Sequence, residues 1–135
     1  MLELIIAAGM ASATTPASDP VISELSKDFY SLELAEFTKR VPFRDRHERQ
    51  AERIAKKANC KLHSEVGWIH KRVDFALEVS DSGKINRIIP FDTGCPELEN
   101  YVISHIREYA GRDGAVDHRG QGKWYRQSMT FRWPE

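Results

Sequence analysis

The stretch that decides the fold is Val73-Asp-Phe-Ala-Leu-Glu-Val-Ser-Asp-Ser-Gly-Lys-Ile-Asn-Arg-Ile-Ile-Pro90. Large apolar side chains alternate with small or polar ones over its first seven residues, which is the period of a strand with one buried face. Residues 81–84 then have the chemistry of a turn, with Gly83 free to adopt a positive φ. The apolar run from Ile85 to Phe91 predicts the return strand, so the stretch as a whole predicts a β-hairpin.

A helix and a further strand are expected after the hairpin. Pro96 suits the first position of a helix, Gly111 suits its C-terminal cap, and one apolar stripe joins the two. That stripe consists of Leu98, Val102, Ile106 and Tyr109. Lys123 to Trp133 alternates apolar and polar residues again and predicts a closing strand, although Gln127 interrupts its apolar side. The C-terminal half therefore predicts a hairpin–helix–strand unit with a small antiparallel sheet.

The N-terminal half predicts helices. Asp19 and Pro20 form a plausible helix start, and apolar residues at helical spacing continue through Thr38. A second helix is expected from Asp45 to Ala58, with a narrow stripe of alanine and isoleucine on a highly charged surface. We expect one α+β domain over residues 21–135, with its helical part at 21–59.

The hairpin–helix–strand unit, over roughly residues 73–133, resembles the C-terminal domain of the TonB/TolA family of energy transducers. The strand, turn and isoleucine-rich second strand of residues 73–90 carry this resemblance. Thr93-Gly-Cys-Pro-Glu-Leu98 is similar to the start of that family's helix, and Met129-Thr-Phe-Arg-Trp133 is similar to its last strand. The family's Arg-Phe-x-Pro helix ending is replaced by Tyr109-Ala-Gly-Arg, and no anchor or proline-rich spacer is seen, so the resemblance bears on the fold more than on energy coupling.

What the resemblance implies is a non-enzymatic protein that binds an envelope protein, such as an outer-membrane receptor or transport component, in TonB-linked transport. An extended segment of that partner adds as a strand to an open sheet edge. The edge is expected at Lys123–Trp133 or at Ile85–Phe91, and it could also join two copies of the chain. The candidate partner-binding residues are Trp124, Tyr125, Arg126 and Trp133, because tryptophan, tyrosine and arginine dominate binding hot spots. For Tyr125 and Trp133, which share the apolar side of the strand, a place in the core is the stronger hypothesis.

The first thirteen residues bear on the compartment. Met1–Ala13 is apolar and ends in Ala-Ser-Ala, a small-x-small pattern that a signal peptidase accepts. We predict a cleaved signal peptide over residues 1–13, a linker over 14–20, and a periplasmic or secreted protein without a stable membrane anchor. The alternative is a short buried element of a cytosolic domain, since Glu3 stands where a signal peptide carries lysine or arginine.

Cys60 and Cys95 are the two cysteines of the chain. Two cysteines and five scattered histidines form no metal-binding spacing, so neither a metal nor another cofactor is expected. In an oxidising compartment the pair is expected to form a disulfide, which would close a 36-residue loop counted from 60 to 95. Such a loop stabilises the fold by about 3–4 kcal/mol in the chain-entropy model. The alternative is two unrelated thiols.

Composition leaves two further hypotheses. The 135 residues carry 20 basic and 20 acidic side chains, so the net charge is zero. It therefore gives no reason to expect a nucleic-acid partner. Residues 39–61 nevertheless hold nine basic and three acidic residues, and a cytosolic nucleic-acid-binding protein could use the helix at 44–61. A solvated helix is the simpler explanation, because base-stacking aromatics are not interleaved there.

A small hydrolase using Cys60 and His63 is the other alternative, but no third orienting group is evident.

Overall fold

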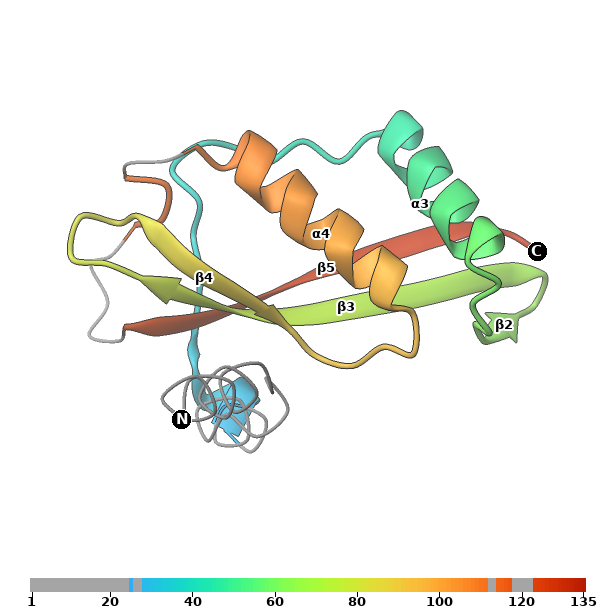
Figure 1. Ribbon diagram of the computed structural model, residues 1–135, viewed down its shortest axis with the longest axis horizontal. Coiled ribbons are helices and arrows are strands. Elements are labelled where there is room, and N and C mark those ends of the chain that lie inside the picture. Colours follow the sequence, from blue (N-terminus) through green and yellow to red (C-terminus); the bar gives the residue numbers. More distant parts are fainter. Residues whose placement is uncertain (1–24, 26–27, 112–113, 118–122) are drawn as a thin grey trace, which may run out of the picture.

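The computed structural model describes residues 25, 28–111, 114–117 and 123–135, and it is a mixed α+β fold (Figure 1). The elements in chain order are η2 (Phe29–Ser31), β1 (Glu33–Leu34), α3 (Asp45–Lys57), β2 (Ser64–Glu65), β3 (Trp68–Val79), β4 (Ile85–Pro90), α4 (Pro96–Tyr109) and β5 (Trp124–Pro134). The expected hairpin, the second helix, the helix after the hairpin and the closing strand are therefore all present. No helix in these ranges has the length and apolar character needed to cross a bilayer.

β3 is the central strand of the sheet. β5 pairs with it antiparallel over almost its whole length, from Trp68 opposite Pro134 to Glu78 opposite Trp124. On the other side of β3, β4 pairs with the second half of the strand and β2 with its first two residues. β1 pairs with β5 in parallel over two residues only. The sheet thus ends in β4 and β2 on one side, and in β5 with its short neighbour β1 on the other.

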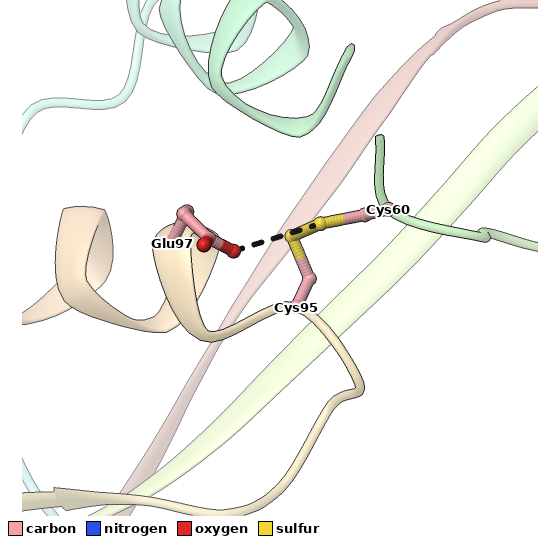
Figure 2. Close-up of side chains that lie close together, drawn as sticks. All are labelled: Cys60, Cys95 and Glu97. Atoms are coloured by element: carbon pink, nitrogen blue, oxygen red, sulfur yellow. Dashed lines mark hydrogen bonds between the residues drawn. A yellow bond between two sulfur atoms is a disulfide. The ribbon is translucent and has the colours of Figure 1, made fainter. Parts of the chain in front are cut away.

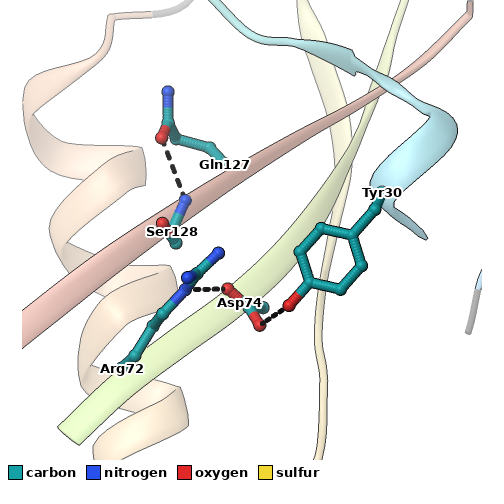
Figure 3. Close-up of polar contacts among 5 residues, drawn as sticks. All are labelled: Tyr30, Arg72, Asp74, Gln127 and Ser128. Carbon is teal, nitrogen blue, oxygen red and sulfur yellow. Dashed lines mark hydrogen bonds and ion pairs between the residues drawn. The ribbon is translucent and has the colours of Figure 1, made fainter.

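α3 and α4 lie on the same face of the sheet (Figure 1), and the core lies between them and the strands. The largest fully buried side chains of this layer are Tyr125, Phe75, Phe131, Leu77, Leu98, Ile106, Val73 and Val102. On the opposite face, η2 places the ring of Phe29 edge-on against that of Phe91, with 4.7 Å between centroids. The Tyr30 hydroxyl reaches Asp74 of β3 there, at 3.4 Å (Figure 3).

Two features place α4: its buried apolar stripe, and hydrogen bonds between its first turn and the residues just before it. Leu98, Val102 and Ile106 are buried, at the four-residue spacing that keeps them on one side of a helix. Just before the helix, the backbone N–H and the hydroxyl of Thr93 both donate to Glu99, at 2.8 and 2.7 Å. Gly111 follows the helix with φ +90°, a conformation that an L side chain would strain.

The prediction that the first helix continues to Thr38 is wrong. Among the described residues of that segment, Leu25 and Asp28 are helical, and η2, β1 and non-helical chain up to Thr38 follow them. The reason is tertiary, because the Ala35 N–H donates to the carbonyl of Arg126 at 2.9 Å and Ala35 is buried. Pairing with β5 thus outweighs the local preference for a helix that the spacing of apolar residues indicates.

β3 also begins at Trp68, earlier than the expected Val73. The proposed signal peptide and linker lie outside the described residues.

Candidate functional site

The outer edge of β5 is the longest unpaired strand edge among the described elements. β1 covers only its start, with Glu33 opposite Tyr125 and Leu34 opposite Arg126. Among the residues that the structure describes, the bond from Ala35 to the Arg126 carbonyl is the last backbone bond on that side. Because groups along a strand alternate in direction, the N–H and C=O of Ser128, Thr130 and Arg132 point the same way, away from β3. The edge from residue 127 onward therefore has the geometry needed to receive a strand.

Side chains of this chain bond two of those three outward N–H groups. The Ser128 N–H donates to Oε1 of Gln127 at 3.0 Å (Figure 3), and Nε2 of Gln127 donates to the carbonyl of Ala35 at 2.9 Å. The Arg132 N–H donates to Oε1 of Glu48 on α3, also at 3.0 Å. Within the described ranges, no hydrogen bond reaches the Thr130 N–H between them.

A groove of about 670 Å³ runs beside this edge, between β5 and the chain from 35 to 43. Its lining residues are Ala35, Phe37, Thr38, Arg40, Val41, Phe43, Phe75, Ile106, Gln127, Ser128, Met129 and Thr130. A second hollow of about 400 Å³ shares Arg40 and Phe43 with it and adds Pro42 and Arg44. Apolar and polar side chains both line the groove, and it lies where alternate side chains of an added strand would point.

The edge at Ile85–Phe91, the other one expected from the sequence, is less suitable. β4 spans only Ile85–Pro90, and Pro90 has no N–H to offer a partner. Short, proline-containing edge strands are a common way of preventing strand addition. Of the two predicted edges, the geometry therefore favours β5.

The four predicted partner-binding residues all lie on β5, but not on its open edge. Tyr125 and Trp133 are only 2% and 4% exposed, which agrees with the stronger hypothesis that they fill the core. Burial raises the pKa of the Tyr125 hydroxyl, which has no hydrogen-bond partner among the described groups. Trp124 is half-buried, with the guanidinium of Arg87 at 5.1 Å from its ring, and Nε of Arg126 donates to the Leu32 carbonyl at 3.0 Å.

Residues missed by the sequence reasoning form much of the site. Gln127 did leave a signal, because a polar residue interrupts the apolar side of an otherwise regular strand. Glu48 left none, because on a charged helix it looks like one more solvated side chain. Phe43 and Thr130 carry no pattern that separates a groove wall or an open strand edge from an ordinary loop or strand.

Cys60 and Cys95 are joined in a disulfide, as expected, with 5.5 Å between their Cα atoms (Figure 2). Cys95 is buried at the start of α4, and Glu97 lies 4.0 Å from the Cys60 sulfur. The two sulfurs and this carboxylate lie within 4.8 Å of one another, but disulfide sulfurs are not the thiolates that bind zinc. Cys60 also has no thiol to act as a nucleophile, and the exposed His63 lies 3.8 Å from Glu65.

Two buried histidines hold the wall of the groove. The rings of His47 on α3 and His105 on α4 lie 4.6 Å apart, and Nε2 of His105 is 2.8 Å from the Pro42 carbonyl. Nδ1 of His47 accepts the Arg44 N–H at 2.9 Å, so it satisfies a donor at the start of α3. Burial lowers the pKa of His47, and the neighbouring His105 lowers it further. The pair therefore fixes residues 42–44 beside β5.

No protein-family model, curated protein or solved structure matches this chain. The resemblance to the TonB/TolA C-terminal domain therefore stays a prediction.

Proposed function

We propose that this chain is a non-enzymatic periplasmic or secreted protein that binds an extended segment of an envelope protein along the outer edge of β5. One observation carries the proposal: an unpaired strand edge centred on Thr130 borders a partly apolar groove of about 670 Å³. Strand addition uses both features, because the backbone supplies affinity while pockets for alternate side chains supply specificity.

The space at the edge limits the bound segment to a short one. β1 ends its pairing at Arg126 and Glu48 of α3 meets the edge at Arg132, so the open stretch runs over residues 127–131. An added strand of about five residues fits this length at the usual rise of ~3.3 Å per residue. One of its side chains would enter the groove, whose lining includes Phe43 and Met129.

The disulfide supports the compartment that we propose. A buried disulfide is typical of proteins outside the reducing cytosol. In the envelope, the partner we propose is an outer-membrane receptor or transport component that works with a TonB-like system. Residues 124–126 lie beside the start of the edge, so Trp124 and Arg126 would contact the end of a bound segment.

A proline substitution at the centre of the edge tests the proposal. Thr130→Pro removes the outward N–H, whereas Thr130→Ala keeps it and serves as the matched control. Both variants should fold, because the bonds to β3 come from the neighbouring residues. In pull-downs from envelope extract, we expect Thr130→Ala to retain a specific envelope protein and Thr130→Pro to lose it. Equal capture by the two variants would contradict strand addition at this edge.

The compartment has its own test. N-terminal sequencing of protein purified from the native envelope should find a mature chain that begins at Thr14. A chain that retains Met1 and is found in the cytosol would contradict the proposed location.

A further inference from the structure

We propose that Glu48 and Gln127 hold the outer edge of β5 closed in the free protein, and that a partner segment binds by displacing these two side chains. The inference rests on the proposed function and adds how binding at that same site is controlled.

Glu48 does what a carbonyl of a neighbouring strand would do. It comes from α3, 84 residues away in the chain, and its Oε1 accepts the outward N–H of Arg132 at 3.0 Å. A carboxylate is a stronger acceptor than a peptide carbonyl, so it competes well for this N–H group. A partner strand can reach the Arg132 N–H only after the carboxylate has moved away.

The side-chain amide of Gln127 links the end of the β1 segment to the next outward N–H of β5. Its Nε2 donates to the Ala35 carbonyl and its Oε1 accepts the Ser128 N–H, at 2.9 and 3.0 Å. One side-chain amide thus replaces the peptide group that a longer β1 would have supplied. The Ser128 N–H becomes available to a partner only when this amide swings out.

The two bonded positions flank the open one. Ser128 and Arg132 lie two residues on either side of Thr130, which is the repeat at which strand groups point in one direction. A partner can therefore make its first backbone bond at Thr130 and then replace Gln127 on one side and Glu48 on the other. The same arrangement blocks edge-to-edge pairing with a second copy of the chain, which is the usual hazard of an unpaired strand.

Amide hydrogen exchange measures the closed state directly. We expect Glu48→Ala to speed exchange at the Arg132 amide at least tenfold, with little change at Thr130. The control is Glu52→Ala on the same helix, whose carboxylate pairs with Lys56 at 2.6 Å and makes no bond to β5. Glu52→Ala should leave exchange at Arg132 unchanged. Equal exchange at Arg132 in wild type and Glu48→Ala would overturn the inference and leave strand addition intact.

Capture from envelope extract tests the displacement step. Glu48→Ala and Gln127→Ala should each retain several-fold more of the envelope protein than wild type, and adding Thr130→Pro should abolish the gain. Faster exchange with unchanged or weaker capture would show that Glu48 is not in the partner's way, and would overturn the displacement. If Thr130→Ala captures nothing and Glu48→Ala captures nothing, the proposed function fails together with the displacement step.

Discussion

The two helices cover the same face of the sheet but are held there by different means. α4 presents a stripe of Leu98, Val102 and Ile106, all buried. α3 buries only His47 and two alanines, and it is tied to its neighbours by the disulfide beyond its end and by the Glu48 bond to β5. Burial of apolar area is not directional, whereas these ties fix one position. The helix that borders the candidate site is thus the one whose placement depends on a few specific contacts.

The largest effect should come from the core of α4. Leu98→Ala removes a fully buried side chain, so we expect the free energy of unfolding to fall by about 4 kcal/mol. The matched change on α3 is Ile54→Ala at a half-buried position, which should cost about 1 kcal/mol. Chemical denaturation measures both. Equal losses of unfolding free energy in the two variants would mean that apolar burial holds α3 and α4 equally.

The next effect should come from the disulfide. The double variant Cys60→Ser/Cys95→Ser should lose about 3 kcal/mol of stability, mainly because its unfolded chain is no longer constrained. Amide exchange should rise more along α3 than along α4, since Cys60 lies three residues after the end of α3. Uniform acceleration over both helices would mean that α3 is held as firmly as α4 without it. Adding a reductant to the wild-type protein should reproduce the result.

The next largest effect should come from acid, which protonates His47 and so weakens the contacts that hold α3. The pKa of His47 is lowered in the folded protein by burial and by His105, so the unfolded chain takes up a proton more readily. Stability is therefore greatest above the ordinary pKa of 6.5 and falls as the pH drops through and below that value. His47→Gln keeps an acceptor for the start of the helix but does not titrate, so its melting temperature should fall less over this range. An equal fall of the two melting temperatures would contradict this role of His47.

The smallest effect should come from the charged surface of α3. Lys56 pairs with Glu52 at 2.6 Å, but its side chain is 65% exposed. Exposed pairs of this kind contribute about 0.5 kcal/mol or less, and less still at high salt. Lys56→Ala should therefore leave the midpoint of denaturation almost unchanged. A loss above ~1 kcal/mol would show that the cationic surface, and not only the ties, holds α3 in place.

Local patterns predicted the elements, and the family resemblance named the strand at Lys123–Trp133 as one of two candidate edges, but neither predicted the contacts along that edge. The hairpin, α4 and β5 follow from periods of two and of nearly four residues, which appear within a few neighbours in the sequence. β1 depends instead on a pairing between Ala35 and Arg126, and no local period reports it. The disulfide could be expected only once the compartment was assumed. Gln127 was visible as an irregularity, whereas the partner of Glu48 lies on a strand 84 residues away and left no trace on the helix.

The disulfide also determines how the protein would respond to a pulling force. With 35 residues of separation between its cysteines, the loop that contains β2, β3 and β4 cannot lengthen when the chain is stretched from its ends. β1, α3 and β5 lie outside that loop, so they can be pulled away from β3 while the loop keeps its length. The fully stretched molecule would be shorter by roughly 115 Å than its reduced form. Single-molecule stretching with and without reductant would measure this difference as a change in the length of the fully extended chain.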